Sequence, residues 1–319
     1  MTIIVTGSAG FIGFHLSEAL LKRGEKVIGL DNISDYYSKK LKRDRNNILE
    51  KYENYKFYHQ DLCDFNVLKK IFDKNKIHKI CHLAAQAGVR YSIINPHQYQ
   101  KSNLEGFTNI LEMARHFKVK NFVFASSSSV YGGNKKLPFS VVDDVSKPVS
   151  FYGATKVANE LMAYSYHYMY GVPTIGLRFF TVYGPWGRPD MAYFKFTDKI
   201  IKGGSIDVYN QGDMKRDFTY IDDIVEGVIS SLEKVFDFEI FNLGNNKPVN
   251  LLDFINILEK KIGMKAEKNM LPMQPGDMKE TYADISKSTK MLGFKPKTYI
   301  KEGLSRFVEW YKEYYKIKI

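Results

Sequence analysis

A tyrosine and a lysine stand four residues apart in FYGATKVANE, as Tyr152 and Lys156. On a helix, residues with this spacing share one face, so the ammonium would lie beside the phenol. A phenol has a pKa of about 10, and a positive charge held close, from lysine or from a nicotinamide, lowers that pKa. Tyr152 could then take a proton from a sugar alcohol while hydride leaves the same carbon. The spacing also occurs by chance on surface helices, so it needs support from other motifs.

Four serines, Ser126 to Ser129, precede Val130, Tyr131 and Gly132. A polar linker is one reading of this run. It follows the apolar segment NFVFA, however, and doubly wound sheets bind ligands at the carboxyl ends of such strands. A hydroxyl there could hold the reacting sugar oxygen and share its proton with Tyr152. The position therefore favours a catalytic edge over a linker.

The N-terminal segment carries GxxGxxG between an apolar run and a helical pattern, as Gly7, Gly10 and Gly13. Glycines let backbone amides approach a pyrophosphate, and the helix N-terminus adds partial positive charge. Asp31, at the end of the second apolar run, is placed to accept from an adenosine ribose hydroxyl, which favours NAD over NADP. A turn that needs glycine only for packing is the alternative.

Further cofactor contacts are expected where the following strands end. Asp61 and Leu62 end the third strand, where the carboxylate would meet adenine's amino group or cap a helix. The small residues of AAQAG (84–88) would let a cofactor lie against the sheet edge. The expected cofactor-binding set is Gly7, Gly10, Phe11, Ile12, Gly13, Asp31, Asn32, Asp61, Leu62, Ala84, Ala85, Gln86, Ser126, Tyr152 and Lys156.

Strands and helices alternate through the first half of the chain. The strands are expected at 2–7, 26–31, 56–61, 79–85, 121–127 and 173–180, with apolar helical stripes at Ile12, Leu16, Ala19, Leu20 and at Leu104, Phe107, Ile110, Leu111, Ala114. This alternation predicts an α/β fold of Rossmann type, a doubly wound parallel sheet followed by a smaller α/β C-terminal lobe.

The pattern loosens after Phe180. Residues 183–190 read as a loop, and 212–228 as loop, turn and then helix, with Asp222 and Asp223 at the helix start. One more strand is expected at 240–245. Helices are expected at 250–262, 284–292 and near 301–315.

Composition limits the class of protein. The chain has 319 residues, 44% of them hydrophobic and 26% charged, which is typical of a soluble globular protein. The formal net charge is +12, but the lysines are spread along the chain without a nucleic-acid-binding signature, so no nucleic acid partner is expected. The charge suits an anionic small substrate.

Location and metal content follow from what the sequence contains. No run is long and apolar enough for a membrane span, and MTIIVTGSAGFIG lacks the features of a signal peptide. Cys63 and Cys81 are the two cysteines, too few for a metal cage or a disulfide framework. We therefore expect a cytoplasmic protein with neither a metal site nor a membrane partner.

Together these motifs resemble the extended short-chain dehydrogenase/reductase family, in its nucleotide-sugar-modifying branch, essentially from end to end. In that family the catalytic Ser or Thr stands four residues before a Tyr-Gly pair, which implies Ser127 here. Tyr152 and Lys156 match the family's base and its supporting lysine. Asn103, in KSNLEGF, matches a helix asparagine near the site and joins the cofactor-binding set; an ordinary polar helix residue is the alternative.

The resemblance also implies the reaction. Family members oxidise C4 of a sugar to a 4-keto intermediate with transient NADH. The 4,6-dehydratases and the decarboxylating xylose synthases carry Asp or Glu two residues before the Tyr of the serine loop, where this chain has Ser129. Without that acid, return of hydride to the other face of the ketone is favoured, which inverts C4.

The segments 83–92, 178–192 and 216–224 are similar to those of UDP-glucuronate 4-epimerases, which convert UDP-glucuronate to UDP-galacturonate. Thr181 stands where galactose-type epimerases carry Asn and suits a carboxylate acceptor; Arg188 offers a charge-assisted partner, unless it is a surface loop arginine. The expected substrate-binding residues are Arg90, Ser128, Thr181, Arg188, Tyr209, Arg216 and Asp277, with Arg216 at the diphosphate and Asp277 at the uridine ribose.

Domain limits and assembly complete the expectation. Residues 1–178 with about 219–245 would form the NAD-binding domain, and about 179–218 with 246–319 the nucleotide-sugar-binding lobe. The resemblance implies a homodimer through helices within 98–117 and 152–170, and a role in polysaccharide biosynthesis. The alternatives are a UDP-glucose or UDP-N-acetylglucosamine 4-epimerase, a UDP-sugar decarboxylase or dehydratase, and a non-catalytic NAD-binding protein.

Overall fold

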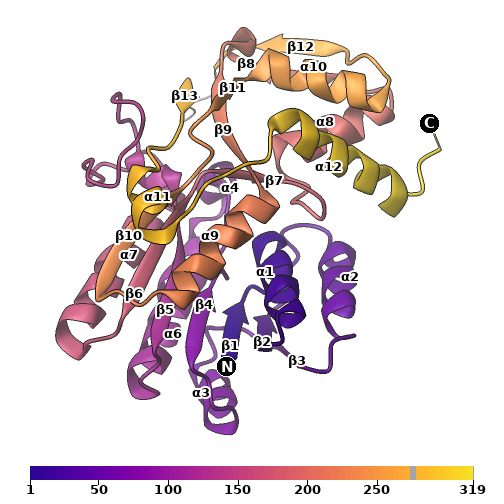
Figure 1. The fold of residues 1–319 in the computed structure, drawn as a ribbon. Helices are drawn as coiled ribbons and strands as arrows, with labels where there is room; N and C mark the ends of the chain where they lie inside the picture. Colours follow the sequence, from indigo (N-terminus) through magenta and orange to yellow (C-terminus); the bar gives the residue numbers. More distant parts are fainter. Residues whose placement is uncertain (274–277, 319) are drawn as a thin grey trace.

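A seven-stranded parallel sheet forms the base of the molecule (Figure 1). The computed structural model describes residues 1–273 and 278–318. Every neighbouring pair in the sheet is parallel, as buried apolar strands that alternate with helices require. The order across the sheet is β10 (Phe238–Leu243), β6 (Thr174–Phe179), β5 (Asn121–Ser127), β4 (Lys79–His82), β1 (Thr2–Thr6), β2 (Lys26–Asp31) and β3 (Tyr55–His59). The Rossmann-type doubly wound sheet is thereby confirmed.

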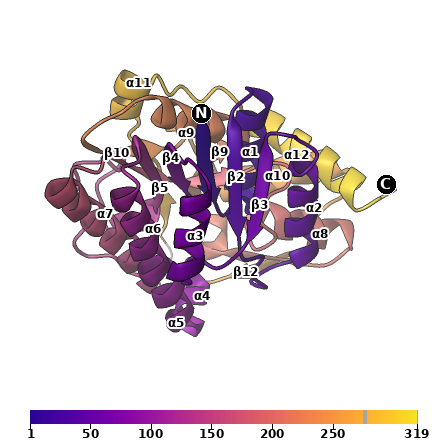
Figure 2. The same ribbon diagram turned by 90° about the horizontal axis from the view of Figure 1, so that it is seen from below.

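Helices cover both faces of this sheet, as the view from below shows (Figure 2). One face carries α1 (Phe11–Lys22) and α9 (Ile221–Glu233), which pack against each other, with α2 (Lys39–Leu49) beside α1. The other face carries α3 (Phe65–Lys74), α6 (Gly106–His116) and α7 (Phe151–Tyr170). No helix among residues 1–273 and 278–318 is long and apolar enough to cross a bilayer.

Short helical turns lie at the carboxyl ends of β4 and β5, the edge at which the sheet would bind a ligand. They are α4 (Val89–Ile94), α5 (Pro96–Tyr99), the π-helical segment η1 (Gln100–Glu105) and the 3₁₀ turn η2 (Ser128–Tyr131). The π-helical segment runs directly into α6, and such bulges are frequent at functional sites.

Most of the remaining elements lie above this edge of the sheet, while α11 (Ser286–Leu292) packs against β10 and α9 (Figure 1). Strand β9 (Lys215–Tyr220) pairs with β7 (Thr181–Tyr183), β11 (Pro248–Asn250) and β13 (Glu280–Thr281), and β8 (Ile206–Tyr209) pairs with β12 (Lys268–Leu271). The helices are α8 (Ala192–Ile201), η3 (Asn210–Gly212), α10 (Leu251–Ile262), α11 (Ser286–Leu292) and α12 (Ile300–Tyr314). The boundaries between two domains stay a prediction.

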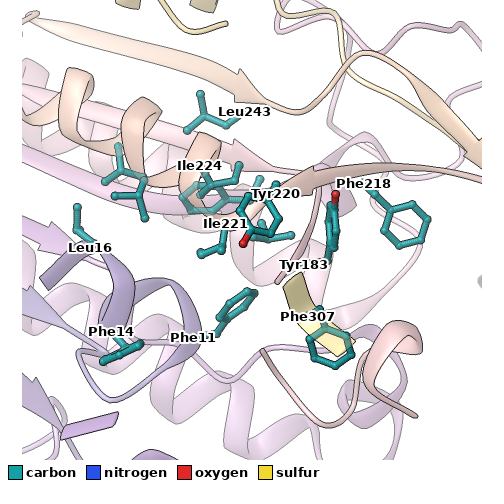
Figure 3. Close-up of a cluster of buried hydrophobic side chains, with 14 of the residues drawn as sticks. Phe11, Phe14, Leu16, Tyr183, Phe218, Tyr220, Ile221, Ile224, Leu243 and Phe307 are labelled. Carbon is teal, nitrogen blue, oxygen red and sulfur yellow. The ribbon is translucent and has the colours of Figure 1, made fainter. Parts of the chain in front are cut away.

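A continuous apolar cluster joins the two parts of the molecule (Figure 3). Phe11 and Phe14 of α1 lie near Ile221 and Ile224 of α9, and the cluster continues through Tyr183 and Phe218 to Phe307 of α12. Burying each such side chain contributes roughly 1.5–3 kcal/mol. The edge of the sheet and the elements above it are therefore held together by one core.

The structure differs from the sequence-based expectation most clearly at residues 212–228. The first part was predicted as loop and turn, but Lys215–Tyr220 is strand β9, with α9 following it as expected. The segment pairs with three strands that are distant in sequence or short. Its charged residues, Lys215, Arg216 and Asp217, have little strand propensity of their own. The pairing could not be predicted from them, because strand formation depends strongly on non-local contacts.

Candidate active site

A cavity of about 760 Å³ opens at the carboxyl ends of the large sheet, between it and the elements above. This volume lies within the range of ligand sites. Nearly all the expected site residues line it: Gly7, Gly10, Phe11, Ile12, Gly13, Asp31, Asn32, Asp61, Leu62, Ala84, Ala85, Gln86, Arg90, Ser126, Ser127, Ser128, Tyr152, Lys156, Thr181, Arg188, Tyr209 and Arg216. Asn103 is not among them, and Asp277 lies outside the described residues.

The glycine turn is shaped by close backbone contacts. Gly7 has φ +72°, and a Cβ on it would lie 2.8 Å from the backbone nitrogen of Ala84. A Cβ on Gly13 would lie 2.0 Å from the carbonyl oxygen of Gly7. The turn therefore needs glycine for packing, and it also brings the first amides of α1 to the cavity.

Two carboxylates mark the same end of the cavity. Asp31 accepts from the backbone N–H of Ala9 (3.1 Å) and of Ile33 (2.8 Å), so it is fixed against the glycine turn. Asp61 accepts from the Asn32 amide (3.0 Å) and the Cys63 N–H (2.9 Å); these bonds outweigh partial burial and lower its pKa. A glycine turn at a helix N-terminus with Asp31 beside it is a set that fits a dinucleotide such as NAD.

Tyr152 lies in the first turn of α7, close to the serine run. Ser150 caps the helix by accepting from the Gly153 N–H (3.0 Å). A Cβ on Gly153 would lie 2.7 Å from the carbonyl oxygen of Ser129, so glycine lets α7 approach the serine turn. The Tyr152 phenol lies close enough to Ser127 for the serine hydroxyl to act on its pKa, in the lowering direction. The structure thus brings the expected base and the expected catalytic serine together.

The electrostatics of Tyr152 differ from the expectation. Burial raises its pKa above the usual value, while the Ser127 hydrogen bond and the charge of Arg188 act in the opposite direction. Lys156 is 2% exposed, and its ammonium donates to the carbonyl oxygen of Ala125 (3.0 Å). Burial lowers the pKa of Lys156 to about 8. For the residues of the chain alone, burial decides the direction of the Tyr152 pKa, and the lowering expected from Lys156 and a bound nicotinamide stays a prediction.

The serines differ in what their hydroxyls contact. Ser127 accepts from the backbone N–H of Ser129 (3.1 Å), which starts the 3₁₀ turn η2. Ser128 and Ser129 line the cavity. Ser126 donates to Glu160 Oε1 (2.5 Å), on the buried side of the strand. The hydroxyl of Ser126 is therefore engaged by Glu160, while the residue also lines the cavity, and its expected cofactor contact stays a prediction.

The side chain of Asn103 is hydrogen-bonded to the backbone of Gln86 and does not line the cavity. Its side chain accepts from the Gln86 N–H (2.8 Å) and donates to the Gln86 carbonyl (3.0 Å) and to Thr155 Oγ1 (3.0 Å). Its own carbonyl in the π-helical segment accepts from Asn159 of α7 (2.6 Å). Asn103 thus connects the end of β4 to α7. A direct cofactor contact by its side chain does not fit this arrangement.

Arg188 lies at the rim of the cavity in an ion pair that the sequence analysis missed. Its Nε and NH2 groups donate to Asp190 (3.0 and 2.6 Å), and Asp190 also accepts from the Tyr36 hydroxyl (3.2 Å). The Arg188 charge holds the pKa of Asp190 below its usual range. Arg188 is therefore a held cation at the cavity rather than a surface loop residue.

The other candidate substrate residues lie along the far wall. The guanidinium of Arg90 lies over the ring of Tyr209, 5.0 Å from its centroid. Arg216 donates to the carbonyl oxygens of Lys215 and Lys279 (2.9 and 3.2 Å). Both arginines line the cavity, so this end is positively charged and suits a diphosphate.

One arginine connects the two ends. Arg45 is fully buried and donates to the carbonyl oxygens of Ala9 (2.9 Å), Trp186 (2.5 Å) and Gly187 (3.0 Å). Ala9 belongs to the glycine turn, and Trp186 and Gly187 to the loop that carries Arg188. These two loops lie side by side at Arg45 and share it as one anchor.

The sequence reasoning missed several residues besides Arg45. Tyr36, Lys42 and Asp190 line the cavity, and Glu160 and Arg178 lie beneath the serine run. Asp190 could have been found as the acid two residues after Arg188. Glu160 could have been found as the acid one helical turn after Lys156.

Comparison with known proteins identifies the class. The model of the family described as GDP-mannose 4,6 dehydratase matches residues 4–307, and the chain belongs to this family. Among similar sequences, an uncharacterised protein of Methanocaldococcus jannaschii is 58% identical over 98% of this chain and 96% of its own. The chain is also 47% identical to UDP-glucuronate 4-epimerase 4 of Arabidopsis thaliana, over 99% of this chain and 76% of that protein.

Solved structures give the same picture. UDP-glucuronic acid 4-epimerase from Bacillus cereus, in complex with UDP-glucuronic acid and NAD, superposes with a TM-score of 0.92, at 36% identity over 99% of this chain and 100% of that one. UDP-glucose 4-epimerase from Thermotoga maritima, with UDP-glucose, gives 0.90 at 30% identity, over 99% and 100%. The resemblance to the extended short-chain dehydrogenase/reductase family, in its nucleotide-sugar epimerase branch, is confirmed.

Proposed function

We propose that this protein is an NAD-dependent UDP-glucuronate 4-epimerase that inverts C4 to give UDP-galacturonate. One observation carries the proposal: the Ser127–Tyr152 pair and Lys156 lie at one edge of a cavity that has a dinucleotide turn at one end and Arg188 at its rim. The relatives named UDP-glucuronate 4-epimerase, and the structure solved with UDP-glucuronic acid and NAD, support it.

The residues of the chain have distinct tasks in this reaction. The Gly7–Gly13 turn and Asp31 would hold NAD, and the chemistry that NAD supplies when bound is reversible acceptance of hydride from C4. Tyr152 takes the proton of the sugar 4-hydroxyl and later returns it to the ketone oxygen. Ser127, next to Tyr152, is proposed to share that proton. The ammonium of Lys156, held on Ala125, supplies positive charge beneath the site.

Inversion requires the 4-keto sugar to present its other face before hydride returns. The UDP end must stay bound meanwhile, and we propose that Arg90, Tyr209 and Arg216, which line the cavity, hold it. No net oxidation results, because the hydride and the proton that leave C4 and its oxygen both return.

The placement of acids argues against 4,6-dehydration. That reaction would need an acid and a base near C5 and C6, in the serine turn beside Tyr152. Among residues 1–273 and 278–318, the aspartates that line the cavity are Asp31, Asp61, Asp190 and Asp207. Asp31 and Asp61 belong to the dinucleotide end, Asp190 pairs with Arg188, and Asp207 belongs to β8. Within the serine turn, Ser128 and Ser129 offer only hydroxyls.

A 4-keto uronic acid is a β-keto acid and can lose CO₂. An epimerase must therefore hold the carboxylate away from the geometry that aligns the breaking bond with the ketone. Thr181 and Arg188, at the cavity, are proposed to do so. Incubation with UDP-glucuronate followed by NMR of the products tests the function: UDP-galacturonate is expected, and a mainly pentose product or no product would overturn it.

A UDP-glucose 4-epimerase is the second candidate, because the Thermotoga maritima enzyme has the same fold. Thr181 disfavours it, since galactose-type epimerases carry Asn at that position. A substrate panel of UDP-glucuronate, UDP-glucose and UDP-N-acetylglucosamine distinguishes them by kcat/KM.

We further propose a cytoplasmic homodimer that serves polysaccharide biosynthesis. The dimer is supported by exposed apolar side chains on α7: Leu161, Tyr164, Tyr168, Met169 and Tyr170. The product, an activated uronic acid, is a donor suited to polymer synthesis. Light scattering of the purified protein gives the oligomeric state, with a mass of about 74 kDa expected from two chains of 36.9 kDa.

A further inference from the structure

A buried ion pair lies beneath the serine run. Glu160 of α7 and Arg178 of β6 form two parallel hydrogen bonds, Nε to Oε1 at 2.9 Å and NH2 to Oε2 at 2.8 Å. Their exposed fractions are 7% and 3%, and neither is among the residues that line the cavity. The ion pair therefore reaches the cavity only through a residue that contacts both.

Ser126 is that residue. Its hydroxyl donates to Glu160 Oε1 at 2.5 Å, and Ser126 is itself 2% exposed. Ser126 and Arg178 are register partners on the adjacent strands β5 and β6. The carboxylate thus accepts from both, and hydrogen bonds to an ionised acceptor are stronger than neutral ones.

The same helix contacts the end of β5 on three successive turns. Tyr152, Lys156 and Glu160 are spaced four apart on α7. Tyr152 lies beside Ser127, Lys156 donates to the carbonyl oxygen of Ala125, and Glu160 accepts from the hydroxyl of Ser126. Two of these contacts belong to the proposed chemistry. The third joins the hydroxyl of Ser126, which lines the cavity, to Glu160, which does not.

We infer that Ser126 is a positioning residue: the Glu160–Arg178 pair holds its hydroxyl and so keeps the end of β5 in register with α7, with Ser127 opposite Tyr152. The inference rests on the proposed function. A buried ion pair is often no more stabilising than an apolar replacement, so stability alone does not account for Glu160 and Arg178. Positioning of Ser126 does account for them. An apolar replacement would leave the Ser126 hydroxyl without an acceptor.

Arg178 also contacts residues farther from the cavity than Ser126. Its guanidinium lies over the ring of Tyr131, 4.9 Å from the centroid, and Tyr131 donates to Asn242 (2.6 Å). Asn242 is the register partner of Arg178 on β10. A polar row therefore runs across β5, β6 and β10, and Tyr131, which ends the serine turn, rests on it.

Two matched double variants separate the hydrogen bond to Ser126 from the charge pair. Glu160→Gln with Arg178→Met removes both charges but keeps a carbonyl acceptor for Ser126. Glu160→Leu with Arg178→Met removes the charges and the acceptor. Each leaves no unpaired buried charge. The readouts are kcat and KM for UDP-glucuronate together with the thermal midpoint.

We expect the Gln variant to keep kcat within threefold of wild type. We expect the Leu variant to lose at least tenfold in kcat, with KM changed less than threefold, because neither residue contacts substrate. Ser126→Ala, which leaves the ion pair intact, should also lower kcat without a change in KM. This variant replaces the Leu variant as the test if the Leu variant fails to fold.

Glu259→Leu is the matched control for loss of a buried acid. Glu259 is 3% exposed and pairs with Lys265 and Lys268 in the upper part of the molecule. It should lower the thermal midpoint and leave kcat unchanged. Equal kcat in the two double variants together with an unaltered Ser126→Ala enzyme would overturn the inference. Absence of turnover in wild type would instead refute the proposed function.

Discussion

Arg188 and Asp190, two residues apart in the loop after β7, form a bidentate ion pair at the rim of the cavity. The hydroxyl of Tyr36, from the loop after β2, donates to the same carboxylate. The cation proposed for the sugar carboxylate is therefore oriented by Asp190, which Tyr36 in turn fixes.

Replacing Asp190 with Asn should weaken binding of UDP-glucuronate. Arg188 loses its charged partner and the fixed orientation that the partner gives, which we expect to raise the Kd about tenfold, or ~1.4 kcal/mol. Binding of UDP-glucose, which has no carboxylate, should change less. Titration calorimetry of both nucleotides measures the difference. Asp73→Asn, at an exposed ion pair with Lys69, is the control. Equal loss for both sugars would mean that Asp190 holds only the loop.

Tyr152→Phe should remove the proton acceptor while leaving the fold intact. General acid–base catalysis contributes about 10²–10⁴-fold, so kcat should fall by that order. NAD should stay bound, since the dinucleotide turn is unchanged. Tyr166→Phe is a matched control on the same helix: its hydroxyl donates to Glu112 (2.7 Å), and it does not line the cavity. Retained activity in Tyr152→Phe would refute the assigned base.

Lys156→Met should raise stability at neutral pH while abolishing turnover. Burial lowers the pKa of Lys156 to about 8 from 10.5. Below pH 8 the folded protein keeps the buried charge, at a cost of up to about 3 kcal/mol. From pH 8 to 10.5 the unfolded chain binds the proton that the folded one has lost, so wild-type stability gains with rising pH.

The stability advantage of Lys156→Met should therefore be largest at pH 7 and vanish near pH 10.5. Urea unfolding of both proteins at pH 7 and pH 10 measures it. Lys79→Met removes another buried lysine, which donates to the Leu232 carbonyl (2.6 Å) away from the cavity, and should leave kcat unchanged. A Lys156→Met protein that is less stable than wild type at pH 7 would contradict the argument.

Gly13→Ala should disrupt the dinucleotide turn. The added Cβ would lie 2.0 Å from the Gly7 carbonyl oxygen, a backbone atom that cannot move aside. Overpacking alone costs about 1–3 kcal/mol, and this contact should reach the upper end or beyond. Gly204→Ala, whose Cβ would meet nothing nearer than 3.6 Å, is the control. Chemical denaturation of both variants measures the difference; equal stability would show that the turn can open.

The large sheet was predictable because each of its strands is a short apolar run that can be recognised from neighbouring residues alone. Strands β2 and β5 have the predicted bounds, 26–31 and 121–127. Strand β9 was not, since Lys215, Arg216 and Asp217 give it little local strand character and its partners are distant in sequence. Pairing of that kind is decided by tertiary contacts.

The cavity residues were predictable where a motif fixes them, and not where long-range contacts do. The Gly7–Gly13 turn, Ser127, Tyr152 and Lys156 all line the cavity as expected. The direction of the Ser126 hydroxyl depends on Glu160, 34 residues later. The contact between Tyr36 and Asp190 spans 154 residues. Such orientations follow from the fold, and no local pattern in the sequence indicates them.

Arg45 bonds at once to the glycine turn and to the loop that carries Arg188. Because one side chain fixes both, the two walls behave as parts of one frame. We expect the frame to stay still while the sugar ring swings inside it about its link to the diphosphate. We then expect rotation of the 4-keto sugar inside a rigid site, and not opening of the protein, to limit the rate of inversion.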